Sequence, residues 1–255
     1  MATAAAKNIR LANDPERQAR IDLAAAFRWA ARMGLNEGAS NHFTYAVPGT
    51  DNTRFLVNPH GLHFKEIRAS DLLLINAKGE VLAGEYPLES SAHHIHIPVH
   101  LARPDAACVL HAHMPYATAL TGVEGGTLVP VHQNHLRFHN RVAYYETYGG
   151  VAIEDSEGER MAASLGDKWI LMLANHGVLV TGPTVGLAFD DLYYLERAAQ
   201  VQVLAMATGK KLLPIPEPEA TRTAAQYAKE KDLYSNIHFE ALKCILLREE
   251  PGFAE

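Results

Sequence analysis

The chain has 255 residues, of which 48% are hydrophobic and 20% are charged. This composition is typical of a folded globular protein and excludes a disordered one, and the length fits one α/β domain. The formal net charge is −6 and the sequence contains no run of Lys and Arg. We therefore expect no nucleic-acid partner and no membrane partner, because nothing here would hold a phosphate backbone or an anionic lipid surface.

The cysteines and the apolar segments indicate a cytoplasmic protein. Cys108 and Cys244 form no CxxC motif and cannot build a disulfide framework. The longest apolar stretches are too short to span a bilayer, and the alanine-rich start lacks the basic and apolar segments of an export signal. The unusual feature is 14 histidines, an excess that raises the hypothesis of a metal site.

The first predicted element is a helix. Asp14, Pro15 and Glu16 form a typical helix start, and apolar residues at helical spacing continue to a stop at Gly34. Short runs rich in β-forming residues follow and are separated by turn residues. These runs predict strands at residues 42–47, 54–59 and 72–76.

Helices and strands alternate in the next part of the chain. Glu89, Ser90 and Ser91 offer an N-cap for a helix over residues 92–102, although Pro98 argues against an unbroken helix. Further strands are predicted at residues 107–112, 169–174 and 178–181, and further helices from residue 115 and over residues 184–207. This alternation predicts an α/β layer architecture.

We expect the chain to divide near Leu213. Residues 1–212 form the predicted main domain, and a proline-rich linker follows it. Residues 213–255 are expected to be a helical extension with two helical stretches, at 220–229 and 237–248. The extension should pack on the same domain or on a neighbouring subunit.

Three histidines are candidate ligands of a metal site. His111 and His113 lie at the end of a predicted strand, where residues two apart project from the same face and can bind one ion. His94 and His96 have the same spacing within a predicted helix, where their side chains diverge. His176 lies in a turn between two apolar strands, so it fits either a third ligand or a turn residue that caps a carbonyl. Three histidines with an open fourth position are how catalytic zinc sites are built.

Two motifs around these histidines resemble a known superfamily. The sequences LARPDAACVLHAH at 101–113 and ANHGVLV at 174–180 are similar to the two metal motifs of the class II aldolases and adducins. The similarity extends over about residues 24–209, and residues 40–44, 57–61 and 198–209 are most similar to the adducin-type branch. The resemblance implies a three-layer α/β/α fold with a central, largely antiparallel sheet.

The resemblance also implies the ligands and the assembly. The metal ligands would be His111, His113 and His176, and the ion would be divalent, most often Zn²⁺, with Mn²⁺, Fe²⁺ or Co²⁺ as alternatives. Members of the superfamily are commonly tetramers with the active site between subunits, which implies a homo-oligomer.

The acid/base residue of the aldolases is missing from this chain. The resemblance implies an acidic residue 19 positions before the first ligand, and that position is Ala92. Glu89 and His96 are the predicted catalytic replacements, with His93 as a further candidate, and the superfamily often carries a histidine at the position of His96. His93, His96 and His100 share one helical face by their spacing.

The predicted substrate site is not that of a phosphorylated sugar. The Gly-Asn of the aldolases' phosphate loop is replaced by Asn41-His42, although two serines match their phosphate-binding pair. A segment of closely spaced histidines, predicted as a strand, could line the mouth of the pocket. The candidate substrate-binding residues are Ser90, Ser91, Asn41, His42, His132 and His135.

The predicted function is a metal-dependent lyase acting on a small molecule. It would break a carbon–carbon bond of a hydroxy or oxo acid, by retro-aldol cleavage or decarboxylation, and stabilise the enolate on the histidine-bound ion. The missing acid favours decarboxylation, because loss of carbon dioxide needs no base to deprotonate a substrate hydroxyl. The alternative is a non-catalytic adducin-like assembly module with a vestigial metal site. Dehydration of a sugar phosphate is a third possibility, which the altered phosphate loop disfavours.

Overall fold

A single mixed sheet forms the centre of the molecule. The computed structural model describes residues 12–150 and 154–255. Within these residues, eight strands form one sheet in the order β4-β3-β2-β1-β5-β8-β7-β6. The strands are β1 (His42–Ala46), β2 (Arg54–Val57), β3 (Leu73–Asn76), β4 (Val81–Ala83), β5 (Cys108–Ala112), β6 (Val142–Tyr145), β7 (Ile170–Leu173) and β8 (Gly177–Gly182). Among the strands of the described residues, β6 and β7 alone pair in parallel, so the predicted, largely antiparallel sheet is confirmed.

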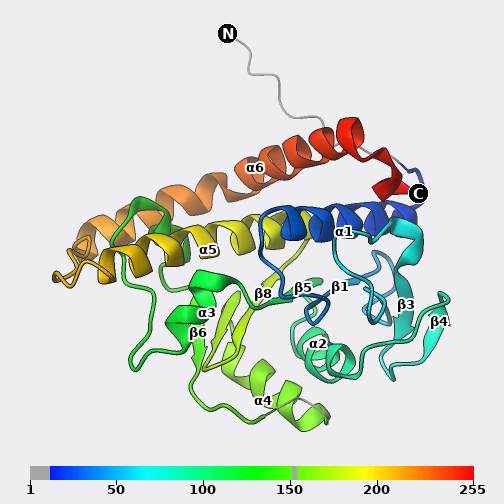
Figure 1. Ribbon diagram of the computed structural model, residues 1–255, viewed down its shortest axis with the longest axis horizontal. Coiled ribbons are helices and arrows are strands. Elements are labelled where there is room, and N and C mark those ends of the chain that lie inside the picture. Colours follow the sequence, from blue (N-terminus) through cyan, green and yellow to red (C-terminus); the bar gives the residue numbers. More distant parts are fainter. Residues whose placement is uncertain (1–11, 151–153) are drawn as a thin grey trace.

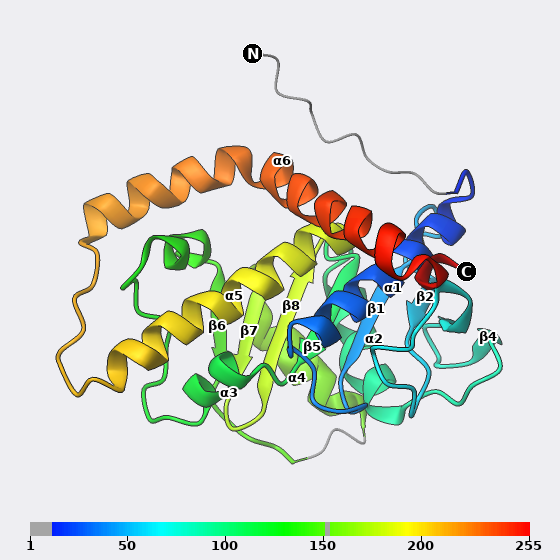
Figure 2. The same cartoon turned by 45° about the horizontal axis from the view of Figure 1, so that its top comes forward.

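Helices cover both faces of the sheet and confirm the three-layer architecture. They are α1 (Pro15–Arg32), α2 (Ser90–Ala102), α3 (Pro115–Thr121), α4 (Asp155–Leu165), α5 (Val185–Met206) and α6 (Glu217–Glu249), with short 3-10 helices η1 (Ala69–Asp71), η2 (Gln133–Phe138) and η3 (Pro251–Ala254). In Figure 1, α1 and α5 lie on one face of the sheet, while α2 and α4 lie on the other. Helix α6 lies outside α1 and α5, as Figure 2 also shows. No helix in the described part of the chain is long and apolar enough to span a membrane.

The alternation of side chains along β5 assigns the two faces of the sheet. Cys108, Leu110 and Ala112 belong to the large core beneath α1 and α5. Val109 belongs to the core beneath α2 and α4. Since alternate residues of a strand share a face, His111 projects toward α2, away from the main core.

The C-terminal extension is one helix rather than the two predicted stretches. Helix α6 runs unbroken through residues 217–249, because nothing between residues 220 and 249 is a Gly or Pro that would interrupt it. It packs on its own chain: the Trp29 indole donates to the Leu242 carbonyl at 2.9 Å, and the buried Lys243 ammonium pairs with Asp22 at 2.8 Å.

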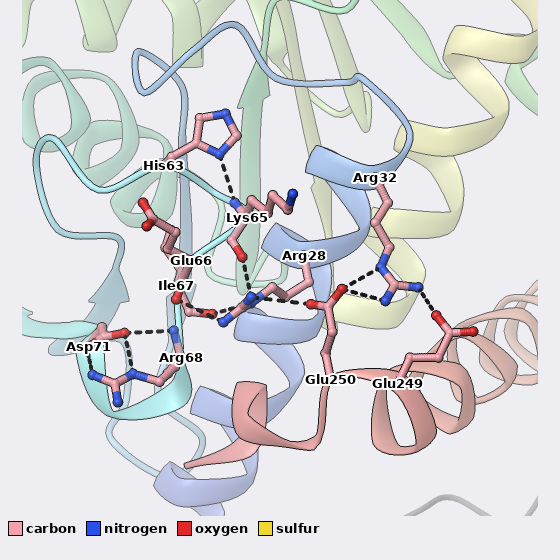
Figure 3. A network of polar contacts seen from close by, with 10 residues as sticks. All are labelled: Arg28, Arg32, His63, Lys65, Glu66, Ile67, Arg68, Asp71, Glu249 and Glu250. Carbon is pink, nitrogen blue, oxygen red and sulfur yellow. Dashed lines mark hydrogen bonds and ion pairs between the residues drawn. The ribbon is translucent and has the colours of Figure 1, made fainter.

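A polar network fixes the end of α6 against α1. Figure 3 shows Arg32 of α1 paired with Glu249 at 2.7 Å and with Glu250 at 2.6 Å. Arg28 pairs with Glu250 at 3.3 Å and also donates to the carbonyl of Ile67 at 2.8 Å. The network therefore joins α6, α1 and the loop before η1.

Three local expectations differ from the structure. Helix α2 begins at Ser90 and continues through Pro98, which is tolerated within it. Residues 133–138 form the 3-10 helix η2 rather than a strand, so the strand predicted for the histidine-rich segment is wrong. The short elements β4, β6 and α4 were not expected, because none of them carries a long apolar period.

Candidate metal centre

Three histidine rings converge at one end of the sheet. His111 comes from the end of β5, His113 follows that strand, and His176 lies in the turn between β7 and β8. Their ligand atoms all lie within 4.8 Å of one another, and Nε2 of His111 is 3.1 Å from Nε2 of His113. The structure thus brings together the three predicted ligands.

The far sides of two rings are held by hydrogen-bond acceptors. Nδ1 of His111 lies 3.0 Å from the carbonyl oxygen of Val178, and Nδ1 of His113 lies 2.6 Å from the Glu37 carboxylate. A carbonyl and a carboxylate only accept hydrogen bonds, so in the neutral rings both protons are on Nδ1. The two Nε2 atoms then face each other with lone pairs and no proton between them. This donor set fits a divalent cation, since ligating histidines usually donate their other N–H to such partners.

The turn that carries His176 has a constrained backbone. Asn175 adopts a left-handed conformation with φ of 56°, and its N–H donates to the Thr121 carbonyl at 3.0 Å. A Cβ at Gly177 would lie 2.7 Å from the Ala112 carbonyl oxygen and 2.8 Å from Cδ2 of His113. Only glycine therefore allows β8 to come this close to the His113 ring.

Helix α3 is fixed directly after His113. The buried carboxylate of Glu196, on α5, accepts hydrogen bonds from the N–H groups of Tyr116 and Ala117 at 2.9 Å each. These are N–H groups of the first turn, which have no partner within their own helix. Glu196 thus anchors the start of α3, which follows His113 in the chain.

His42 lies beside the three rings. It pairs with His111 in the register of β1 and β5, and the two ring centroids are 5.0 Å apart. Burial, opposed by Glu89 and assisted by the nearby His113 and His176, lowers the pKa of His42 to about 4. The ring is therefore neutral near pH 7.

A chain of hydrogen bonds runs from His42 into the interior. Nδ1 of His42 lies 2.8 Å from Nε2 of His96, and Nδ1 of His96 lies 2.7 Å from the Thr44 hydroxyl. The same hydroxyl lies 2.7 Å from Nε2 of His100. At the other end, Nε2 of His42 lies 3.2 Å from the Ser91 hydroxyl.

Glu89 sets the direction of this chain. Its carboxylate can only accept, so the Ser91 hydroxyl donates to it at 2.6 Å. Ser91 must then accept from Nε2–H of His42, which leaves Nδ1 of His42 to accept from His96. By the same reasoning the Thr44 hydroxyl donates to Nδ1 of His96 and accepts from Nε2–H of His100. Each neutral imidazole carries one proton, so the network assigns a single tautomer to each ring.

Three further residues that the sequence analysis singled out lie close to this row of hydrogen bonds. The amide oxygen of Asn41 accepts from the Glu37 N–H at 2.7 Å, and its Nδ2 is buried with no hydrogen-bond partner among the described residues. Ser90 is exposed at the start of α2. Ala92 is 1% exposed and packs in an apolar cluster with Phe55 and Val57.

His132 and His135 lie far from the three rings of their own chain. Strands β6 and β7 run in parallel toward the turn that carries His176, and η2 precedes β6, so η2 lies at the opposite end of the sheet. There Gln133 donates to the Tyr227 hydroxyl of α6 at 2.9 Å. His135 is 4% exposed, and burial lowers its pKa to about 4.

Sequence reasoning missed three residues near the centre. Thr44 follows His42 by two positions in a predicted strand, so alternation could have placed both on one face. Glu37 lies in a loop and Tyr148 follows β6, with its ring centroid 6.4 Å from that of His176; no periodic signal marks either residue. Next to His176 a cavity of about 420 Å³ is lined by Asn175 and by residues of the loop after α3 and the end of β6.

The α/β/α fold and the three histidines that converge at one end of the sheet are the features of a metal-binding α/β protein. Comparisons with known proteins point to a family of this kind. Residues 21–203 match the profile of the Class II Aldolase and Adducin N-terminal domain. A candidate aldolase class 2 protein of Caulobacter vibrioides is 34% identical over 245 residues, 95% of this chain and 94% of that protein. Alpha-adducin of Rattus norvegicus is 32% identical over 80% of this chain but only 28% of adducin.

Solved structures give the same result. An aldolase II superfamily protein from Pseudomonas syringae superposes with a TM-score of 0.89 at 33% identity, over 96% of this chain and 98% of that one. An L-fuculose 1-phosphate aldolase from Glaciozyma antarctica superposes with a TM-score of 0.83 at 29% identity, over 96% and 97%. The chain therefore belongs to the class II aldolase and adducin family. Class II aldolases use a divalent metal, typically Zn²⁺, and family members are often oligomeric and act on small molecules.

Proposed function

We propose that this protein is a metal-dependent lyase that breaks a carbon–carbon bond of a small hydroxy or oxo acid, by decarboxylation or retro-aldol cleavage. The observation that carries the proposal is the pair of Nε2 atoms of His111 and His113, 3.1 Å apart with both protons held on Nδ1. Two lone pairs facing each other at this distance are unfavourable unless a cation lies close to them. Zn²⁺ is the proposed ion, with Mn²⁺, Fe²⁺ and Co²⁺ as alternatives.

The surrounding side chains are suited to hold an oxygen-rich substrate. A divalent ion held by the three rings would act as a Lewis acid that polarises a substrate oxygen. The Nδ2 of Asn41, which has no hydrogen-bond partner among the described residues, can donate to a substrate carboxylate or hydroxyl. Ser90 is exposed at the first residue of α2 and can bind the same substrate.

Glu89 and His42 are the proposed proton carriers in place of the acid missing at Ala92. Although burial raises it, the hydrogen bond from Ser91 and the nearby His42 hold the pKa of Glu89 below its usual value. Glu89 is then anionic near neutral pH and can accept a proton. His42 can give the proton on its Nε2 to the substrate carbon after the bond breaks, and a proton that Glu89 has accepted replaces it through the Ser91 hydroxyl. His96 is fully buried, so it acts through His42 rather than on the substrate.

The proposed substrate is not phosphorylated. The L-fuculose 1-phosphate aldolase among the structural relatives acts on a sugar phosphate by its name, but Asn41 and His42 replace the expected Gly-Asn in this chain. The Ser91 hydroxyl, one of the two serines matching a phosphate-binding pair, is already engaged by His42 and Glu89. A phosphate would have to displace both contacts.

The proposed assembly is a cytoplasmic homotetramer. Large apolar side chains are exposed on α5, on α6 and between them, at Leu204, Leu213, Leu233 and Tyr234. In a tetramer, His132 and η2 of one chain could line the centre of a neighbour, which would give these remote histidines a role in substrate binding. Light scattering of the purified protein tests this assembly, and a monomer would contradict it.

The second candidate function is a non-catalytic adducin-like assembly module, which rests on the match to alpha-adducin. Elemental analysis of the purified protein separates the two candidates. Wild-type protein should hold about one equivalent of a divalent ion at this centre, and a His111→Ala/His113→Ala variant should lose it. The loaded protein is then assayed on hydroxy and oxo acids for carbon dioxide or aldehyde release. A wild type that takes up neither Zn²⁺ nor Mn²⁺ would favour the assembly module.

A further inference from the structure

A second group of side chains of the types that bind metal ions lies on the other side of α2. His93 and His94 of α2 meet Asp155, the first residue of α4. Nδ1 of His94 lies 2.6 Å from the Asp155 carboxylate and Nδ1 of His93 lies 3.8 Å from the same oxygen. One ligand atom from each residue lies within 4.8 Å of the other two.

This group is separate from the three-histidine centre. His96 turns toward β1, where it contacts His42 and Thr44, whereas His94 turns toward α4. Residues two apart on a helix project in divergent directions, so α2 presents one set of imidazoles to the sheet and another to α4. The expected common face of His93 and His96 is not observed, because His93 also lies against Asp155.

Close helix packing holds the group in place. A Cβ at Gly158 would lie 2.0 Å from the backbone oxygen of His94 and 2.9 Å from Cγ of Pro98. Glycine therefore lets the first turn of α4 touch the backbone of α2 next to the two imidazoles. Ligands carried on packed helices keep their separation better than ligands carried on loops, which favours a preorganised site.

The chemistry and exposure of the group suit an ion that enters from solvent. The side chains of His93 and His94 are 15% and 24% exposed, while that of Asp155 is 57% exposed. Glu159 lies one turn after Asp155 and, together with His93 and Asp155, lines a groove between α2 and α4. Nε2 of His93 is buried with no hydrogen-bond partner among the described residues, so the ring is not fixed by any other polar contact there.

We propose that His93, His94 and Asp155 form a second divalent-metal site, with Glu159 or water completing the coordination. Two imidazoles and a carboxylate suit Zn²⁺, Co²⁺ or Ni²⁺ better than Mg²⁺ or Ca²⁺, which prefer oxygen ligands. An ion at this site links α2 to α4. Helix α2 also carries Ser91 and His96, and Glu89 caps its N-terminus, so the link stiffens the helix that positions the hydrogen-bond chain.

Equilibrium dialysis against Co²⁺, with elemental analysis of the protein, tests the proposal. Wild type should bind about two equivalents of Co²⁺. His94→Ala and Asp155→Asn should each lose the ion of the second site, and His111→Ala/His113→Ala should lose the ion of the three-histidine centre. Asp155→Asn keeps the size of an exposed side chain, so the fold should survive. His60→Ala removes an exposed imidazole outside both groups and should still bind two.

The outcomes are distinguishable from failure of the proposed lyase. The second site is contradicted if wild type binds one equivalent of Co²⁺ and Asp155→Asn still binds it. It is also contradicted if wild type and Asp155→Asn each bind two equivalents. Wild type could instead bind one equivalent of Co²⁺ that is lost in His94→Ala but kept in His111→Ala/His113→Ala. This result supports the second site and contradicts the three-histidine centre. Visible absorption of bound Co²⁺ adds a readout, since the band from the second site should vanish with Asp155→Asn.

Discussion

The Glu37 carboxylate lies 2.6 Å from Nδ1 of His113 and leaves Nε2 of that ring facing His111. Glu37 comes from the loop after α1, while His113 follows β5, so the contact joins segments 76 residues apart in the chain. The Asn41 amide oxygen holds the same loop by accepting from the Glu37 N–H. A loop carboxylate thus orients a candidate metal ligand that the strand alone leaves free to rotate.

Removing this carboxylate should weaken metal binding. We expect Glu37→Ala to lower Zn²⁺ affinity about 10- to 100-fold, as loss of an outer partner of a ligating histidine usually does. Glu37→Gln should lose less, because its amide oxygen can still accept from Nδ1. Competition with a chromophoric chelator measures both affinities. Glu85→Gln, an exposed change elsewhere, is the control, and equal affinity in Glu37→Ala and wild type would contradict the role of this contact.

A methyl group at Gly177 should displace the His113 ring. The added Cβ would lie 2.8 Å from Cδ2 of His113, so we expect Gly177→Ala to lose the ion and to be destabilised by about 1–3 kcal/mol. Metal content and urea unfolding measure the two effects. Gly122→Ala is a matched control, because its Cβ would meet nothing closer than 3.7 Å. Normal metal content in Gly177→Ala would show that the ring can move without cost.

The Thr44 hydroxyl should be needed to hold the tautomers of the buried histidines. Thr44→Val removes the partner of both His96 and His100, so we expect a loss of about 1–3 kcal/mol in the free energy of unfolding. Thr44→Ser keeps the hydroxyl and should lose less than half of that. Nitrogen-15 NMR of the imidazoles should report Nε2–H for His42 in wild type and Thr44→Ser. A wild-type His42 protonated on Nδ1 instead would contradict the assigned direction of the chain.

The buried histidines should make the folded protein sensitive to acid. Burial lowers the pKa of His100 from 6.5 to about 3, so below pH 6.5 the unfolded chain binds a proton that the folded chain does not. This contribution to stability is complete above pH 6.5 and is lost progressively as pH falls toward 3. For His100 alone the loss between pH 7 and pH 5 is on the order of 2 kcal/mol.

Unfolding in urea at the two pH values measures this loss. His100→Gln removes the titrating ring but can still reach Thr44, so it should lose correspondingly less stability between pH 7 and pH 5. His60→Gln changes an exposed ring and should behave like wild type. An identical pH dependence in His100→Gln and wild type would show that this ring does not titrate differently in the folded and unfolded chains.

The amino-acid sequence by itself determined the α/β class, the first helix, most strands and the convergence of His111 with His113, whereas the assignment of His176 as third ligand came from the family resemblance. These features depend on local signals: capping residues, alternation of apolar residues, and a spacing of two at a strand end. The motifs around His111 and His176 also carried the family resemblance, which the comparisons confirm. The largely antiparallel sheet followed from that resemblance, because strand order cannot be read from local periodicity.

Tertiary structure alone decided what surrounds the three rings. Glu37 meets His113 and Glu196 caps α3 only because distant segments fold together, and no local period marks such pairs. The same reason explains why His135 lies at the opposite end of the sheet: a 3-10 helix packed under α6 replaced the expected strand. A sequence specifies which side chains alternate along each element, whereas their partners depend on how elements far apart in the chain pack.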